Sequence, residues 1–454
     1  MTKQQARTAT PYMEHLRFRM KEYPQIGENV YADWTGAALP PQTLLKAHTK
    51  LLSSTLLGNP HSSHTPSAAA KDMADETRKV VLKELGAEKI PGDEYAVVFT
   101  HNATAAVLLL NHIQWANGSL LMLSDNHNSV NGLRKTAKRE GALTSYSYVR
   151  PDLTVDEDDL SMMLEIQRRK GTNVFAYPMK SNYSGIVHGL SYVEKAQKMG
   201  WKTLLDVSAY LPNHKLDLKA AGIYPDFIPM SFYKIFGYPS GVGCLVIKRS
   251  CFKMLEKKWF SGGSIIFVNV RRDFYIPELK GPALYEDGTI PFLSIPMIQK
   301  GFDYINKARD AYPKQAHTLA SAFYDGLSGM STKKRKVVLH APRDRVSDTV
   351  GFHIMEGGTV IDPDLVEKKA TEQGIHIRSG CHCNPGCNEA VFKYTTDALE
   401  EKIRARQVNP QRWEDVLPLI SPTNVGALRA SFGVANNMGD VSYMLKFFET
   451  FLRQ

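Results

Sequence analysis

Short apolar runs separated by helical segments set the strongest limits on the fold of this chain. Six such runs recur between residues 95 and 248, each followed by a polar or glycine-containing turn: Tyr95–Thr100, Ser119–Ser124, Asn173–Pro178, Lys202–Val207, Phe227–Phe232 and Val242–Lys248. Helical patterns lie between several of them, as over residues 103–113 and 191–199. This alternation predicts an α/β fold with a mostly parallel sheet. Ligands of such sheets bind beyond the carboxyl ends of the strands, so the residues after each run are the candidates for function.

The pattern changes after about residue 300. It predicts a helix over 303–327, strands over 336–340 and 349–356, a helix over 364–373, a strand over 427–432 and a closing helix over 439–452. These elements describe a smaller α+β unit. A length of 454 residues also favours two domains. We therefore expect an N-terminal arm over residues 1–30, a large domain over 31–300 and a small C-terminal domain over 301–454.

Composition and charge exclude several classes of protein. No apolar run approaches the roughly 20 residues that span a membrane, and no signal-peptide pattern opens the chain, so we expect a cytoplasmic protein without a membrane partner. The net charge of +10 is spread along the chain, with one compact basic run at residues 333–336. Such a run is typical of a solvated loop, and we expect no nucleic-acid partner. Five cysteines are too few for a disulfide scaffold, but Cys381, Cys383 and Cys387 lie within seven residues.

Polar residues follow three of the predicted strands. Thr104 lies in a small-residue turn that opens a helix, where backbone N–H groups favour an anion, although a threonine there is also a common helix cap. His127 follows the second run and is either a catalytic or a hydrogen-bonded structural histidine. Asn182 follows the third run and either donates to a ligand oxygen or stabilises a turn.

The next two strands end in an acid and a base. Asp206 ends an otherwise apolar strand, where a buried carboxylate needs a cationic partner. Lys234 lies among aromatic residues after a buried strand, where desolvation favours the neutral amine that forms a Schiff base. An anion-binding turn, a histidine, an asparagine, an acid and a lysine together indicate pyridoxal phosphate as cofactor.

Six strings in the sequence carry a family resemblance, and they extend from about Tyr31 to the small domain. They are Tyr31-Ala32-Asp33-Trp34-Thr35-Gly36-Ala37-Ala38, Gly58-Asn59-Pro60-His61-Ser62, Ser231-Phe232-Tyr233-Lys234-Ile235-Phe236-Gly237, Phe274-Tyr275-Ile276-Pro277, Glu286-Asp287-Gly288-Thr289-Ile290 and Gly380-Cys381-His382-Cys383-Asn384-Pro385-Gly386. The chain resembles enzymes of the class V aminotransferase fold, in particular the cysteine desulfurase branch. Within that branch it is most similar to the amino-terminal, desulfurase-like part of molybdenum cofactor sulfurases.

The resemblance implies a fold, a cofactor and a set of site residues. The fold would be that of fold type I pyridoxal phosphate enzymes, with a mostly parallel seven-stranded sheet in the large domain. Lys234 would form the Schiff base, Asp206 would pair with the pyridinium nitrogen, His127 would stack on the ring and Asn182 would donate to the ring oxygen. Ala103, Thr104, Ala105, Ser231 and Tyr233 would complete the cofactor site. Ser264, in a Gly-Gly-Ser turn, would reach across the interface of a homodimer with shared active sites, and Arg429, Arg378 and Asn59 would bind the substrate.

The cysteine-containing loop decides the expected chemistry. By the resemblance, Cys383 occupies the position of the nucleophile that forms a persulfide, with Cys381 or Cys387 as substitutes. The alternative is a zinc site, because three cysteines with His382 among them offer enough soft ligands. We expect no metal, since no second cysteine pair completes such a site. The sulfurases also carry a further carboxyl-terminal domain, whereas this sequence stops at Gln454, so the sulfur acceptor is not given by the sequence.

These observations favour an enzyme that converts L-cysteine to alanine and leaves the sulfur on Cys383, for transfer to a sulfur-acceptor protein. Two alternatives stay open. One is a lyase, epimerase, cyclase or decarboxylase that uses the same cofactor on another amino acid. The other is a non-catalytic protein that binds a metal or a partner.

Overall fold

The computed structural model of the protein describes residues 3–278, 281–421 and 423–454. The first two residues of the expected N-terminal arm lie outside this range. The described residues form a seven-stranded central sheet with the order β2 (Tyr95–Thr100), β8 (Gly243–Lys248), β7 (Phe227–Ser231), β6 (Lys202–Asp206), β5 (Asn173–Pro178), β3 (Ser119–Leu123) and β4 (Leu143–Ser147). Only β8 runs antiparallel to its neighbours in this sheet. The predicted fold class, a mostly parallel seven-stranded sheet, is confirmed.

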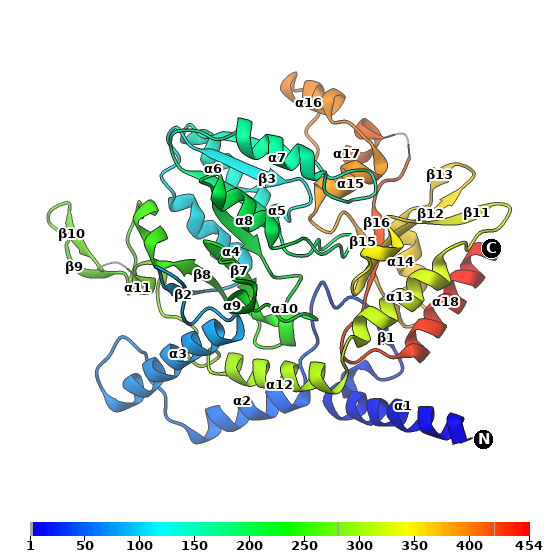
Figure 1. Ribbon diagram of the computed structural model, residues 1–454, viewed down its shortest axis with the longest axis horizontal. Helices are drawn as coiled ribbons and strands as arrows, with labels where there is room; N and C mark the ends of the chain where they lie inside the picture. The colour runs from blue at the N-terminus through cyan, green and yellow to red at the C-terminus, as the bar shows by residue number, and fades with distance from the viewer. Residues whose placement is uncertain (1–2, 279–280, 422) are drawn as a thin grey trace.

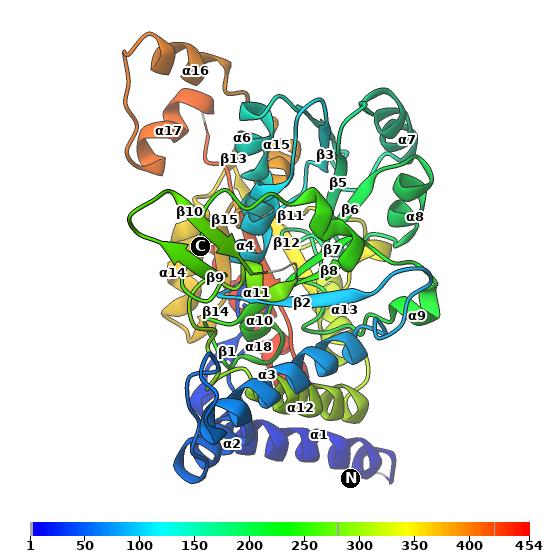
Figure 2. The same ribbon diagram turned by 90° about the vertical axis from the view of Figure 1, so that its left-hand side faces the viewer.

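Helices cover both faces of the sheet, and Figures 1 and 2 show the layers from two sides. On one face α4 (Ala103–Leu108) and α6 (Leu133–Arg139) share an apolar core with alternate residues of β2, β3 and β5. The other face packs against α3 (Thr65–Glu84), α7 (Glu157–Ile166), α8 (Ser191–Lys198) and α12 (Met297–Ala311). Strands β3 and β5 are buried along their whole length. Burial of both faces explains why these runs are continuously apolar instead of alternating.

A second, smaller sheet forms the small domain. Strands β11 (Arg335–Leu339), β12 (Thr349–Glu356), β16 (Ala427–Ser431) and β15 (Arg378–Gly380) pair antiparallel in that order. The helices α13 (Gln315–Leu327), α14 (Pro363–Thr371) and α18 (Met438–Arg453) contribute to the core of this domain.

The beginning of the chain packs against the small domain. Strand β1 (Val30–Tyr31) pairs in parallel with β14 (Ile375–His376), and Asp33 forms a further parallel bridge with Ser431. Val30 and Ala32 are buried in the small-domain core. In α1 (Lys3–Glu22), Arg19 donates to Asp440 at the start of α18, over 2.7 Å.

The predicted helix over 303–327 is wrong, because two helices occupy this region. Helix α12 ends at Ala311 and α13 begins at Gln315. Pro313 lies between them, and a proline lacks the N–H that an uninterrupted helix requires. None of the described helices is long and apolar enough to cross a membrane.

Strand β4, a hairpin and a pair of helices are among the features that were not predicted. Strand β4 is only partly buried and carries serine and threonine. The hairpin of β9 (Ile265–Asn269) and β10 (Phe274–Pro277) projects from the large domain, and α16 (Asp397–Arg404) and α17 (Trp413–Ile420) project from the small domain (Figures 1 and 2).

Candidate active site

A cavity of about 150 Å³ opens where five strands of the central sheet end. Because β2, β3, β5, β6 and β7 run parallel to one another, their carboxyl ends meet at the same edge. Residues at the ends of these strands or shortly after them line the cavity: Asn102, Ala103, Thr104, His127, Ser129, Pro178, Lys180, Asn182, Asp206, Ser208, Ala209, Ser231, Tyr233 and Lys234. The structure thus brings together eight of the predicted site residues, namely Ala103, Thr104, His127, Asn182, Asp206, Ser231, Tyr233 and Lys234.

Lys234 and Asp206 are the base and the acid of this cavity. Lys234 lies on the short helix α10 (Phe232–Phe236) directly after β7. Burial lowers the pKa of the Lys234 ammonium, although the nearby Asp206 carboxylate raises it. One oxygen of Asp206 accepts the backbone N–H of Ser208 over 2.9 Å, which fixes the carboxylate at the cavity wall. The amine is therefore biased toward the neutral, nucleophilic form.

Hydroxyl groups gather at the side of the cavity formed by α4. The hydroxyls of Thr104 and Ser129 are 2.7 Å apart, and the backbone N–H of Ala103 donates to Ser231 Oγ over 2.7 Å. Ser129 Oγ also lies 2.9 Å from His127 Nδ1. The Ala105 amide, expected to bind phosphate, donates to Asn102 Oδ1 as part of the α4 cap, and Ala105 is not among the residues that line the described cavity.

His127 is neutral in this environment. Burial lowers its pKa most, and the charge of Lys234 adds to this effect, so the pKa falls to about 4 although Asp206 raises it. A neutral imidazole suits a flat stacking residue better than a charged one does.

The cysteine-containing loop is held by residues of the large domain, one of which, Asn182, lines the cavity. The backbone N–H of Asn128 donates to Cys383 O over 2.7 Å, and Asn182 Nδ2 donates to His382 O over 2.7 Å. Asn384 Nδ2 donates to Asp125 O over 2.6 Å. The amide of Asn182, expected to donate to a ring oxygen, is thus engaged by this loop in the structure.

The backbone of this loop is strained. His382 and Cys383 have φ angles of +54° and +55°, a region that non-glycine residues rarely occupy. Such strain persists where surrounding contacts fix the backbone, and it concentrates at functional sites.

The three thiols of the loop have different surroundings. Cys381 and Cys383 are exposed, whereas Cys387 is buried, with its Sγ 3.7 Å from Ser181 Oγ. Burial raises the pKa of the Cys387 thiol, which argues against it as a nucleophile. The charge of Cys383 acts on Lys234 and favours its ammonium form, whereas Cys381 acts on Tyr394, whose pKa is raised to about 12 mainly by burial. Of the two exposed thiols, Cys383 is the one whose own backbone carbonyl is held by the large domain, through the N–H of Asn128.

The candidate substrate arginines share one carboxylate. Arg429 is 2% exposed, donates to Asp33 Oδ1 and donates to Asn182 O over 2.8 Å. Its Nε atom is buried and has no hydrogen-bond partner among the described residues. Arg378 lies 3.8 Å from the other oxygen of Asp33. The sequence pattern assigned no role to Asp33, although the residue lies in one of the strings that carry the resemblance.

Lys180 was also missed. Its ammonium group pairs with the carboxylate of Asp348, and both side chains are almost fully buried. The signal in the sequence was that Lys180 follows a buried strand and precedes the candidate Asn182 by two residues.

Asn59 and Ser264 lie outside the described walls of the cavity. Asn59 Nδ2 donates to Thr289 Oγ1 over 3.3 Å. Ser264 Oγ accepts the backbone N–H of Ser261 over 2.9 Å, and the backbone N–H of Gly288 donates to Gly262 O over 2.9 Å. The two residues are thus held beside the segment of residues 286–289 and not beside Lys234.

The described residues contain no group of three or more histidine, cysteine, aspartate or glutamate side chains arranged to hold a metal ion.

Residues 30–444 match the Aminotransferase class-V family. The chain belongs to this family.

Curated relatives of this chain include molybdenum cofactor sulfurases, of which two are described. The human protein is 29% identical over 458 residues, which cover 94% of this chain and 50% of the relative. The tomato protein (Solanum lycopersicum) is 32% identical over 470 residues, which cover 95% of this chain and 56% of the relative. The chain therefore spans about half the length of these relatives.

Solved structures show the same fold. The apo cysteine desulfurase of Thermococcus onnurineus NA1 superposes with a TM-score of 0.76 at 21% identity, over 96% of this chain and 97% of that one. The Escherichia coli cysteine desulfurase CsdA gives a TM-score of 0.74 at 18% identity, over 97% and 98%. Both support fold type I for this class-V member.

Class-V aminotransferases use pyridoxal phosphate, and the cavity fits this group. Ser208 Oγ, in the cavity wall, is buried without a partner among the described residues, which leaves a polar atom for a ligand. Asp206 offers a carboxylate for a protonated ring nitrogen, and Lys234 offers an amine for an aldehyde. The hydroxyls of Thr104, Ser129 and Ser231 offer donors for a phosphate.

Proposed function

We propose that this chain cleaves the C–S bond of L-cysteine with the help of pyridoxal phosphate and holds the released sulfur on Cys383. The observation that carries the proposal is Cys383, an exposed thiol on a loop that is held by Asn128 and by Asn182 of the cavity wall. The names of the relatives and of the solved structures, molybdenum cofactor sulfurase and cysteine desulfurase, support the same chemistry.

Lys234 and two arginines have different roles in the proposed reaction. When bound, pyridoxal phosphate withdraws electrons from the substrate Cα and so makes its proton acidic. Lys234, as a neutral amine, takes that proton and returns it later. Arg429 binds the substrate carboxylate by two parallel hydrogen bonds, in place of its contact with Asp33. Arg378, which is more exposed, adds positive charge at the cavity mouth.

The sulfur step follows from the position of the thiol. The Cys383 sulfur attacks the substrate sulfur, so that an S–S bond forms and the C–S bond of the substrate breaks. The carbon that loses sulfur takes up a proton. L-Cysteine and the Cys383 thiol thereby become alanine and a Cys383 persulfide, and the reaction needs no external oxidant or reductant.

A second copy of the chain would complete the site. Ser264 lies away from the cavity of its own chain and directly before the β9–β10 hairpin, but its side chain is buried and its hydroxyl is bonded to Ser261, so the hairpin and not the Ser264 side chain is the part free to meet a partner. That hairpin exposes apolar side chains, including Ile266, Phe267 and Phe274. An exposed apolar patch of this kind is typical of an interface. Sedimentation of the protein as a dimer, lost in a variant with Ile266→Ser and Phe274→Ser, would support this part of the proposal.

An exposed persulfide on Cys383 is accessible to a sulfur-acceptor protein, which we expect as a second partner. The cytoplasmic location expected from the sequence stays a prediction.

The experiment is to incubate the purified, cofactor-loaded protein with a panel of amino acids and to measure alanine, sulfide and keto acids together. We expect alanine from L-cysteine in the parent protein and none in Lys234→Ala. Cys383→Ala should abolish the bound persulfide, while Cys381→Ala, the matched exposed thiol, should keep it. Turnover of a sulfur-free amino acid at the parent rate in Cys383→Ala would favour the alternative lyase, epimerase, cyclase or decarboxylase.

A further inference from the structure

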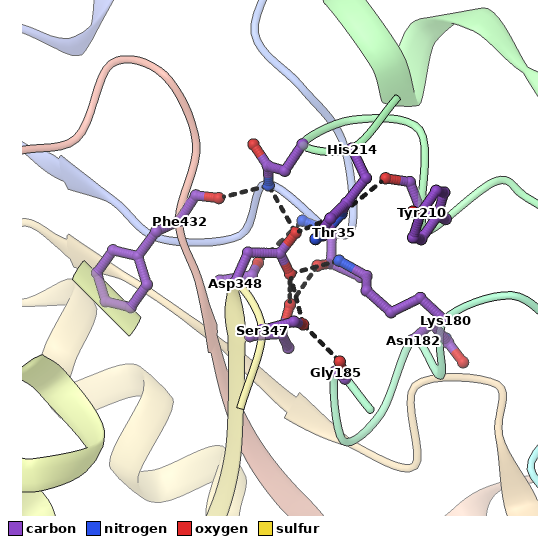
Figure 3. Close-up of polar contacts among 12 residues, drawn as sticks. Thr35, Lys180, Asn182, Gly185, Tyr210, His214, Ser347, Asp348 and Phe432 are labelled. Atoms are coloured by element: carbon purple, nitrogen blue, oxygen red, sulfur yellow. Dashed lines mark hydrogen bonds and ion pairs between the residues drawn. The ribbon is translucent and has the colours of Figure 1, made fainter. Parts of the chain in front are cut away.

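A second cavity, of about 510 Å³, lies between the two domains. Figure 3 shows the pair of Lys180 and Asp348. Asp348 lines this interdomain cavity and Lys180 lines the active-site cavity, so the ion pair lies between the two. His214 also lines the interdomain cavity, with its Nδ1 3.9 Å from Asp348. Nothing in the chemistry proposed above uses this space.

The interdomain cavity carries an excess of positive charge. Its permanently charged lining residues are Arg309, Lys314, Arg345, Asp344 and Asp348. Of the two acids, Asp348 pairs with Lys180, and Asp344 lies 3.7 Å from Arg345. Among the described residues no carboxylate lies within 4 Å of Arg309 or Lys314, and the neighbouring Asp310 pairs with Lys215 instead. Arg309 and Lys314 are therefore left without an ion-pair partner in the part of the chain that the structure describes.

Arg309 is the more informative of the two. It is partly buried near the end of α12, one of its Nη atoms donates to Leu211 O, and its Nε is buried without a partner among the described residues. Burial lowers the pKa of Arg309 to about 10, against the effect of Glu84 and Asp310. The buried Nε–H of Arg309 lacks a hydrogen-bond partner, which costs free energy, and a bound anion would supply that partner.

The start of α13 supports the same ligand. This helix has 13 residues, its N-cap is Lys314, and no described side chain caps it. Ala316, in its first turn, lines the cavity. Uncapped N–H groups at the start of a helix favour an anion, independently of the arginine.

We propose that the interdomain cavity binds a small organic anion through Arg309 and the start of α13. The charged group of the ligand is a carboxylate or a phosphate, and its apolar part lies against Tyr312 and Val434, which also line the cavity. This ligand is distinct from the substrate and from the cofactor, because it binds on the other side of the Lys180–Asp348 pair.

The test uses the cofactor-loaded enzyme, in which the phosphate-binding residues of the active site are already occupied. Inorganic phosphate and, in a separate arm, succinate are titrated in by calorimetry at low ionic strength. We expect saturable binding of at least one probe. Arg309→Gln should weaken it at least tenfold and Lys314→Gln about threefold, while Lys307→Gln should leave it unchanged, since Lys307 is exposed on the same helix α12 but lies outside the described lining.

Arg309→Lys keeps the charge and should bind the probe more tightly than Arg309→Gln at an equal melting temperature. If Arg309→Gln does not fold, the affinity of Lys314→Gln compared with that of the parent protein still tests the proposal, because Lys314 is exposed. The absence of saturable binding of either probe would overturn the proposal. Equal affinity of the Lys314→Gln and parent proteins for the probe would also overturn the proposal. An anion bound at Arg429 instead of the interdomain cavity would keep its affinity in Lys314→Gln.

Discussion

The ammonium group of Lys180 pairs with the carboxylate of Asp348 in the interior, across the boundary between the two domains. Asp348 also accepts Nδ2 of Asn213 over 2.8 Å and the hydroxyl of Thr349 over 2.7 Å. Figure 3 shows this carboxylate among donors from both domains. Thr349 opens β12, which pairs with the strand that carries Arg429, so the ion pair fixes Arg429, the proposed substrate arginine, relative to the cofactor cavity.

Asp348→Asn should therefore destabilise the protein strongly. The change leaves Lys180 as a buried cation without a counter-charge, and we expect a loss of about 3–5 kcal/mol in the free energy of unfolding, measured by urea denaturation. Asp325→Asn is the matched control, because its pair with Arg343 is exposed and should cost at most about 1 kcal/mol. Replacing both partners, by Lys180→Met with Asp348→Leu, should recover much of the loss. Equal losses in the two single variants would contradict the role of the buried pair.

The same carboxylate predicts an acid limit of stability. Although burial raises the pKa of Asp348, Lys180 and His214 lower it to about 2 from the ordinary 3.8. The contribution of the Asp348 carboxylate to the free energy of unfolding is thus complete above pH 3.8 and is lost as the pH falls through about 2. The unfolding free energy of Asp348→Asn should lack this part of the pH dependence.

Arg429→Lys should lower kcat/KM for the amino-acid substrate by about 100-fold. A lysine keeps the charge but cannot form two parallel hydrogen bonds with a carboxylate. The absorbance of the bound cofactor should stay the same. Arg378→Lys should have a much smaller effect, since Arg378 is half-exposed and lies 3.8 Å from Asp33. A similar loss in both variants would show that Arg429 does not bind the carboxylate.

The five cysteines should differ in reactivity toward iodoacetamide. In the native protein at neutral pH, Cys381 and Cys383 should be modified, because both are exposed. Cys244, Cys251 and Cys387 should react only after unfolding, since each is buried and burial raises the pKa of each thiol. Peptide mass spectrometry over time measures this order. Early labelling of Cys387 would mean that the loop opens in solution.

Gly386→Ala should displace the cysteine-containing loop. An added Cβ would lie 2.0 Å from the backbone oxygen of Ser124, at the end of β3, where the backbone cannot easily move. We expect a loss of about 1–3 kcal/mol in unfolding free energy, together with a fall in persulfide yield. Gly132→Ala, where the nearest atom is 3.4 Å away in a helical segment, should be neutral or stabilising by up to about 1 kcal/mol.

His127 should make the cofactor-free protein less stable in mild acid. Burial and Lys234 lower its pKa from 6.5 to about 4, so the unfolded chain takes up a proton before the folded one does. Stability should fall as the pH drops from 6.5 toward 4. His127→Gln should show a shallower slope in this window, and an unchanged slope would mean that His127 ionises freely.

Much of the large domain could be predicted from the sequence, because its information is local. Strands buried on both faces must be apolar along their whole length, and β2 and β5 begin and end at the predicted residues. The carboxyl ends of parallel strands meet at one edge, and this rule was enough to group Lys234, Asp206 and His127. β4 was missed because it is only partly buried and so lacks the apolar run.

Contacts between distant segments could not be predicted in this way. Asp33 and Arg429 are 396 positions apart, and Lys180 and Asp348 are 168 positions apart. Each residue alone resembles an ordinary surface charge. Only the packing of the two domains gives these charges their partners, and periodicity carries no information about such pairs.

The pairing of β1 with β14 has a consequence for synthesis of the protein. Val30 and Ala32 leave the ribosome early but are buried against β16 and β14, which are made near the end. The small domain can therefore not complete its core as an independent unit while the chain is growing. A fragment that begins at residue 301 would expose the surface that these two residues cover. The core of the small domain is complete only when residues from near the two ends of the polypeptide meet.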